Sequence, residues 1–226
     1  MDIISMVFQV VTVVSAFYVV FLIFRKNFEY IGNKLFIVSF FLFGTYALVL
    51  FLYEFPISIL VNEILLNLSL YLVVIGVLFF VLSMQTFTQG SMFLKGLTTR
   101  ILILITIIIC IILAFFPYKV LQVSPNIEAN KNIISLLATG VLSLGFMIYN
   151  LILLYIALSR INKSETFIRK KIKVLAIAQI IGLMSPIMSV IGNILKNDII
   201  HGLMFIFLAI AMVIVGFLIK QKEKIP

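Results

Sequence analysis

The sequence predicts an all-α membrane protein, a bundle of seven transmembrane helices, and three observations lead to this fold class. Of the 226 residues, 64% are hydrophobic and only 11% are charged, and the mean hydropathy is +1.29. A soluble domain is nearer half apolar and a quarter charged. The apolar residues form seven runs that can cross a hydrocarbon core of about 30 Å as helices. These runs are continuously apolar, without the alternation typical of barrel strands. We therefore expect one seven-helix domain over residues 1–226, as a multi-pass protein of the cell membrane.

Short polar or basic segments separate the seven runs and fix their approximate limits. Residues 54–56 (Glu-Phe-Pro) end the second run, and a polar connector over residues 118–132 is long enough to cover part of one membrane face. Pro186 lies near the middle of the sixth run, where proline removes a backbone hydrogen bond and favours a bend. The predicted spans are 3–24, 35–53, 64–88, 101–116, 133–158, 174–195 and 199–219.

The lysine and arginine residues are distributed very unevenly between the two sides of the predicted bundle. The connectors after the first, third and fifth runs, together with the tail, hold fourteen of the seventeen basic residues. The other side holds Lys119, Lys131 and Lys196. Because basic loops are retained in the cytoplasm, this bias predicts an external N-terminus and a cytoplasmic C-terminus.

The most charged stretch, residues 159–173, lies between the fifth and sixth runs. One interpretation is that it fixes the topology and contacts anionic lipid. The other is that it presents a surface to a cytoplasmic signalling protein or to other subunits of a membrane complex. With its basic residues clustered between spans, the chain is not expected to bind nucleic acid. The candidate contact residues are Arg160, Lys163, Arg169, Lys170, Lys171 and Lys173.

The predicted membrane interior lacks the residues that intramembrane chemistry requires. No ionisable side chain lies near the centre of any span, which argues against a proton pump or a carboxylate-coupled transporter. No metal-ligand spacing, nucleophile–base pair or phosphate-binding glycine loop is present either. We therefore expect no enzymatic activity, no metal and no cofactor.

Neutral polar residues within the spans are the first candidates for a binding site. In the sixth run they recur at about four-residue spacing around Pro186, and one more lies in the outer part of the third run. One interpretation is hydrogen bonding between helices, and the other is a polar-lined cavity around a bent sixth helix. The candidate ligand-binding residues of this group are Asn67, Gln179, Ser185, Pro186, Ser189 and Asn193.

A second candidate site lies at the predicted outer ends of the spans. His201, the single histidine, is expected on the same side as Glu54, Glu63 and Asp198. With such neighbours a histidine either titrates near neutral pH or binds a cation; otherwise it is a solvated residue at a helix end. His201 and Glu54 complete the set of candidate ligand-binding residues.

Five short stretches resemble a known class of membrane sensor. They are residues 24–26 (FRK), 44–54 (GTYALVLFLYE), 78–88 (LFFVLSMQTFT), 177–186 (IAQIIGLMSP) and 192–195 (GNIL). In layout and local texture the chain resembles the N-terminal seven-transmembrane sensor region of bacterial and archaeal histidine kinases. Two departures stand out: Phe or Tyr replaces the tryptophan often found in the second span, and we expect no kinase domain after Ile219.

The resemblance implies a receptor-like sensor that passes an extracellular or in-membrane stimulus to a separate cytoplasmic partner. Two other functions remain open on the residues alone. A small-solute transporter or facilitator would use the polar residues of the spans, and a structural subunit of a membrane complex would use the exposed helix faces.

Overall fold

A computed structural model describes residues 3–26, 28–124, 126–162, 164–195 and 197–220. Within them, seven helices are long and apolar enough to cross a membrane, which confirms the predicted helical fold class. A short 3₁₀ helix, η1 (Ser91–Lys95), connects two of them. The seven helices are α1 (Ile3–Lys26), α2 (Ile31–Tyr53), α3 (Ile59–Gln89), α4 (Leu97–Phe115), α5 (Ile133–Arg160), α6 (Thr166–Leu195) and α7 (Asp198–Lys220).

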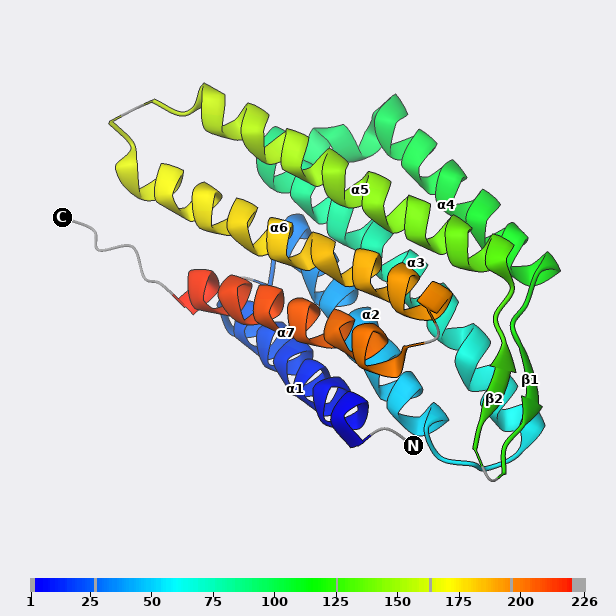
Figure 1. The fold of residues 1–226 in the computed structure, drawn as a ribbon. Helices are drawn as coiled ribbons and strands as arrows, with labels where there is room; N and C mark the ends of the chain where they lie inside the picture. The colour runs from blue at the N-terminus through cyan, green and yellow to red at the C-terminus, as the bar shows by residue number, and fades with distance from the viewer. Residues whose placement is uncertain (1–2, 27, 125, 163, 196, 221–226) are drawn as a thin grey trace.

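Six of the helices form a closed ring, and the seventh lies outside it. Neighbouring helices pack in the order α1, α2, α3, α5, α6 and α7, and α7 returns to pack against α1. α4 packs on the outer side of α3 and α5 (Figure 1). The interior of the molecule is therefore enclosed by six helices.

Local hydrogen bonds explain where several helices begin and end. The side chains of Ser58 and Asn132 accept from the backbone N–H groups of Val61 (3.2 Å) and Ile134 (2.9 Å), which caps the first turns of α3 and α5. α3 ends at Gln89 and is followed by Gly90, whose φ of 89° is readily adopted only by glycine. These caps explain why α3 begins and ends beyond the predicted limits of 64–88.

The connector between α5 and α6 is shorter than the charge pattern predicted. α6 begins at Thr166 instead of residue 174, so most of the basic stretch forms the first turns of that helix. α6 then continues through Pro186 to Leu195 as one helix. A single element thus runs from the basic residues through the whole predicted membrane thickness.

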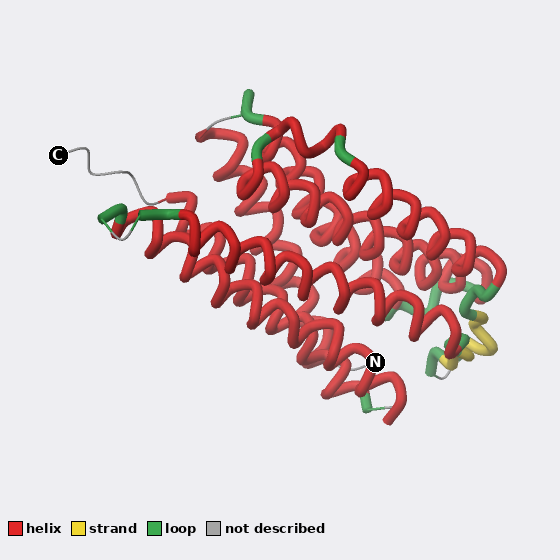
Figure 2. Tube along the Cα trace, turned by 90° about the horizontal axis from the view of Figure 1, so that it is seen from above, coloured by secondary structure: helices red, strands yellow, loops and turns green. Residues whose placement is uncertain are grey.

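Between α4 and α5 the predicted polar connector folds into a two-stranded antiparallel hairpin. Its strands are β1 (Lys119–Gln122) and β2 (Glu128–Asn130), with Lys119 opposite Asn130. The strands lie at one end of the bundle (Figure 2), which we call the hairpin end. The opposite end, where α5 ends and α6 begins, is called the basic end.

Aromatic side chains fill the space between α2 and α3 in the half of the bundle nearer the basic end. The ring of Phe80 lies 5.4 Å from that of Phe36 and 6.0 Å from that of Phe40, centroid to centroid. Ser39 Oγ donates to the Gly76 carbonyl at 2.8 Å, so the two backbones approach closely. Aromatic contacts and this close backbone approach therefore join α2 to α3 in this half of the ring.

Candidate functional site

The ring encloses a cavity of about 1100 Å³ at the hairpin end. Residues of all six ring helices and of the hairpin line it, and α4 contributes none of the described lining residues. Its lining includes Pro56, Leu121 and Asn126, whose side chains are exposed on the surface. The cavity therefore opens at the hairpin end.

The wall of the cavity is largely aromatic and aliphatic. Tyr46 and Tyr118 are both buried, and the Tyr46 hydroxyl donates to the sulfur of Met204 at 3.6 Å. Burial raises the pKa of the Tyr118 phenol, so this group is neutral at physiological pH. Such a wall provides dispersion contacts to an apolar ligand group.

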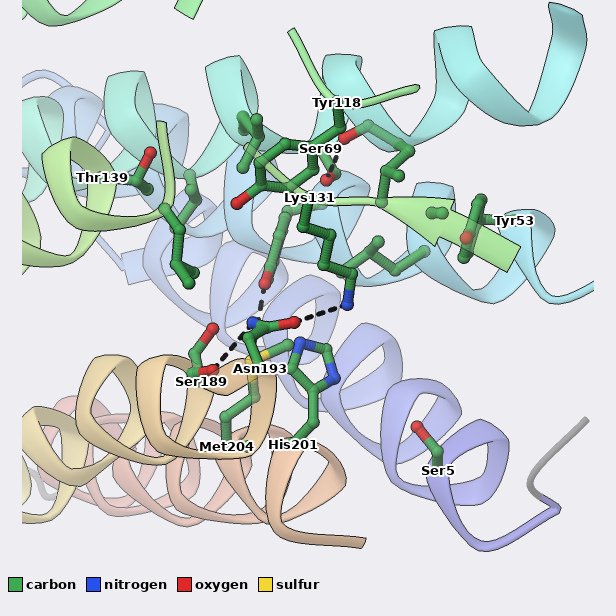
Figure 3. A pocket seen from close by; sticks show the side chains of 18 of the residues that line it. Ser5, Tyr53, Ser69, Tyr118, Lys131, Thr139, Ser189, Asn193, His201 and Met204 are labelled. Atoms are coloured by element: carbon green, nitrogen blue, oxygen red, sulfur yellow. Dashed lines mark hydrogen bonds between the residues drawn. The ribbon is translucent and has the colours of Figure 1, made fainter. Parts of the chain in front are cut away.

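A chain of polar side chains crosses from the hairpin to α6. Lys131, which directly follows β2, reaches into the cavity and donates from its ammonium to Asn193 Oδ1 (Figure 3). Asn193 Nδ2 in turn donates to the Ser189 carbonyl at 2.8 Å. The imidazole of His201, on the first turns of α7, lies beside this chain (Figure 3). A cation is thus held at a defined place in the cavity wall.

Two buried polar atoms in the cavity wall have no hydrogen-bond partner among the described residues. They are Gln9 Oε1 on α1 and Thr139 Oγ1 on α5, and the Gln9 side chain is only 2% exposed. A buried polar atom left without a partner costs about 1–3 kcal/mol. Both residues line the cavity.

The cavity is closed toward the basic end by a floor of apolar side chains. Phe43, Val77, Met147 and Leu208 line both the large cavity and a second void of about 40 Å³ beyond it. That void is large enough for a single water molecule. The floor separates the wide and the tightly packed halves of the ring.

Hydrogen bonds to α3 hold the hairpin over the cavity. The Asn67 side chain donates to the Tyr118 carbonyl (2.8 Å) and accepts from the Tyr118 N–H (2.9 Å), and Nδ2 also donates to the Glu63 carbonyl (2.9 Å). Glu63 Oε2 accepts from the Val120 N–H at 3.1 Å. These bonds fix the start of β1 against the third helix.

Most of the predicted ligand-binding residues meet in this one cavity. Asn67 is not among them, because its side chain is used in holding the hairpin. Gln179 also lies elsewhere: it is 3% exposed, lines the small void beyond the floor, and its Nε2 has no partner among the described residues. The predicted residues that line the cavity are Glu54, Ser185, Pro186, Ser189, Asn193 and His201.

Several lining residues were not among the predicted site residues. They include Gln9, Tyr118 and Lys131, of which only Lys131 was named from the sequence, as a basic residue of the outer side. Tyr118 and Lys131 belong to the predicted polar connector, and the hairpin brings both into the cavity wall.

The acidic residues expected around His201 do not gather into a metal site in the described part of the chain. No group of three His, Cys, Asp or Glu side chains there could hold a metal ion. Glu63 is engaged by the hairpin, and the side chain of Asp198 lies outside the description. His201 instead packs edge to face against Phe205, with 6.4 Å between ring centroids.

At the basic end the predicted contact residues have two different roles. Arg169 Nη1 donates to the Leu158 and Ile161 carbonyls at 3.2 and 2.8 Å, which caps the end of α5. The Lys171 ammonium lies 4.4 Å from the centre of the Phe167 ring. Three side chains are exposed, Arg160, Lys170 and Lys173, whereas Lys163 lies outside the described residues.

No protein-family model matches the chain, and no curated protein matches it in sequence. The structure itself supports a polytopic membrane protein whose helices contact the lipid bilayer.

Proposed function

We propose that this protein is a receptor-like sensor of the cell membrane that binds a small solute in the cavity at the hairpin end. The hairpin end then faces the outside and the basic end faces the cytoplasm, in accordance with the distribution of Lys and Arg. A separate cytoplasmic partner reads the bound state at the basic end. This is the role that the resemblance to histidine-kinase sensor regions implies.

The single observation that carries the proposal is the one-sided cavity itself. It opens at the hairpin end, has an apolar floor, and includes buried polar atoms on Gln9 and Thr139 that lack partners. A volume of about 1100 Å³ is at the upper limit of ordinary ligand pockets, which span about 300–1,000 Å³. The cavity therefore accommodates a solute of substantial size together with water.

α6 provides a direct route from this cavity to the basic end. Ser189 and Asn193 line the cavity, and Lys170 lies in the first turns of the same continuous helix. Arg169 connects those first turns to the end of α5 through two backbone carbonyls. A displacement of α6 caused by a ligand would therefore change the surface formed by α5 and α6 at the basic end.

The test is one-sided chemical labelling of a cysteine placed in the cavity. In a Cys110→Ala background, Ser185→Cys is exposed to a membrane-impermeant thiol reagent from one face of sealed vesicles at a time. We expect labelling from the hairpin side only. Ser39→Cys is the matched control, because Ser39 is a fully buried serine of α2 outside the cavity lining and should react from neither side.

The same experiment distinguishes the proposed sensor from a small-solute carrier, the alternative function that the sequence also allows. Alternating access in a carrier exposes one central position to both faces in turn. Labelling of Ser185→Cys from both sides would favour the carrier, and failure to label from either side would refute a solvent-connected cavity. A sensor keeps the floor of Phe43, Val77, Met147 and Leu208 closed.

A further inference from the structure

Three serine side chains on α5 and α6 line the cavity with hydroxyls that no helix carbonyl accepts from. Ser143 is only 4% exposed, and neither it nor Ser185 or Ser189 has a side-chain hydrogen bond to any described residue. A serine within a helix commonly donates to a carbonyl of the preceding turn. Ser69, which lines the same cavity from α3, donates in this way to the Leu66 carbonyl at 2.7 Å. The hydroxyls on α5 and α6 therefore remain available to a ligand.

Contacts between α5 and α6 place two of these serines at the same level of the cavity wall. The helices are antiparallel neighbours (Figure 1), and Ser143 and Ser185 each lie between two close approaches of the pair. A Cβ added to the glycine would lie 2.7 Å from the partner side chain in the first approach and 3.3 Å in the second: Gly140 with Val190, and Gly182 with Met147. Ser189 is one turn from Ser185 on the same face of α6. The three hydroxyls thus form one group, which we call the serine patch.

Neither helix brings a charge to the serine patch. Residues 133–159 of α5 and 174–195 of α6 include no Asp, Glu, Lys, Arg or His. Elsewhere in the lining, the Lys131 ammonium donates to Asn193 Oδ1, Glu54 has an interaction within the protein, and Glu128 is exposed on β2. An ion bound at the serine patch would lose hydration without gaining an opposite charge, which is unfavourable. A neutral hydrogen-bonding group has no such penalty.

Apolar side chains adjoin the serine patch on two sides. Met147 lies one turn beyond Ser143 toward the basic end and belongs to the floor of the cavity. α7, the other ring neighbour of α6, contributes Met204 and Leu208 to the lining. Ligand pockets commonly use a few polar groups for orientation and an apolar wall for contact area. A solute with one hydrogen-bonding end and an apolar body fits both parts of this wall.

We propose that the solute is uncharged and amphipathic, with a hydroxyl or amide group at one end of an apolar body. Its polar group hydrogen-bonds to the serine patch, because a serine hydroxyl both donates and accepts and so pairs with either kind of neutral group. Its body lies against Met204, Leu208 and the floor. This inference rests on the proposed function, because it specifies the ligand class of the same cavity.

The test uses three probes that share a phenylpropyl body, with the full chain in phosphatidylcholine nanodiscs. The probes are 3-phenylpropanamide, 3-phenylpropionate and 3-phenylpropan-1-amine, which are neutral, anionic and cationic at neutral pH. Calorimetry measures the affinity of each, and empty nanodiscs correct for partition into lipid. We expect the amide to bind at least about tenfold more tightly than either ion. An ion that binds as tightly as the amide, or an amide that fails to bind at millimolar concentration, would overturn the inference.

Two serine variants assign the effect to the serine patch. Ser143→Ala should weaken amide binding at least about threefold, as expected for the loss of one neutral hydrogen bond. Ser69→Ala is the matched control, because Ser69 is also a buried serine of the cavity wall and its hydroxyl already donates within α3. We expect amide binding in this control to stay within about twofold of the unmodified protein. Equal affinities of the two variants would overturn the assignment to the serine patch.

Protection of Ser185→Cys from the thiol reagent distinguishes failure of this inference from failure of the proposed function. Labelling from the hairpin side that saturating amide does not reduce would leave the open cavity and refute this ligand class. A cysteine that is unreactive from both sides would refute the proposed function itself. Loss of amide binding when diacylglycerol is added to the nanodiscs would identify a neutral lipid as the occupant and overturn the soluble ligand.

Discussion

The two halves of the six-helix ring are made by the same helices and differ in how they are filled. Near the basic end, phenylalanine side chains and close backbone contacts occupy the space between α2 and α3. Near the hairpin end, the ring surrounds about 1100 Å³ and exposes polar atoms to it. The half near the basic end is joined by aromatic contacts, and the half near the hairpin end holds the candidate site.

This comparison shows that buried polar residues of the membrane spans have different structural roles. Gln85, at 0% exposure in the packed half, donates to the Tyr149 hydroxyl at 2.9 Å and accepts from Thr99 Oγ1 at 3.1 Å. Gln9, at 2% exposure in the open half, has an acceptor with no partner among the described residues. The first glutamine joins three helices, and the second is a residue of the cavity wall.

The largest loss of stability is expected from adding a side chain where α6 and α7 lie in close contact near the hairpin end. A Cβ added to Gly192 would lie 2.5 Å from the His201 backbone nitrogen, so Gly192→Ala must separate α6 from α7. We expect a loss of about 2–3 kcal/mol in unfolding free energy, as overpacking commonly costs. Thermal unfolding in detergent measures it, and Gly145→Ala is the control, since nothing lies within 4 Å of its added Cβ. Equal stability of the two variants would contradict the close packing of α6 and α7.

An intermediate loss of stability is expected when the hydrogen bonds that hold the hairpin to α3 are removed. Asn67→Leu removes the bonds to the backbone of Tyr118, and we expect the free energy of unfolding to fall by about 1–2 kcal/mol, with faster amide exchange in β1 and β2. Hydrogen-exchange mass spectrometry measures the second effect. Asn67→Asp retains the acceptor for the Tyr118 N–H and should give a smaller increase. Unchanged exchange in Asn67→Leu would show that other contacts hold the hairpin.

The smallest effect is expected in the packed half, where one glutamine joins three helices. Gln85→Leu leaves the Tyr149 hydroxyl without its donor, and we expect a loss of about 1 kcal/mol in unfolding free energy with no change in the labelling of Ser185→Cys from the hairpin side. Thermal unfolding and thiol labelling on the same preparation test both parts. A loss of labelling in the Gln85→Leu protein would show that the two halves are not independent.

The seven spans could be predicted from the sequence because a backbone exposed to lipid must form its hydrogen bonds within helices. The order in which those helices pack could not be predicted. The runs are apolar on nearly every face, so nothing in residues 101–116 predicted that α4 would stay outside the ring. The hairpin was also missed, since its strands depend on Asn67 and Glu63, which are distant in sequence.

The candidate site was predicted in part, and one helix shows why. The spacing of polar residues in the sixth run placed Asn193 and Gln179 in one set, but the floor of the cavity lies between their levels. Whether a polar residue of α6 lines the cavity depends on where α6 diverges from its neighbouring helices. The spacing of residues along a single helix does not indicate where that happens. Lys131 was missed for a related reason. The distribution of basic residues predicted on which side of the membrane it lies, but not how far its side chain reaches into the bundle.

The closure of the ring by α1 and α7 has a consequence for biosynthesis. α7 supplies His201, Met204 and Leu208 to the cavity wall, and it packs against the helix that is made first. Because chains are inserted from the N-terminus onward, the wall formed by α1 remains incomplete until the seventh span arrives. The cavity therefore forms only at the last insertion step, and a chain interrupted before α7 would lack the candidate site.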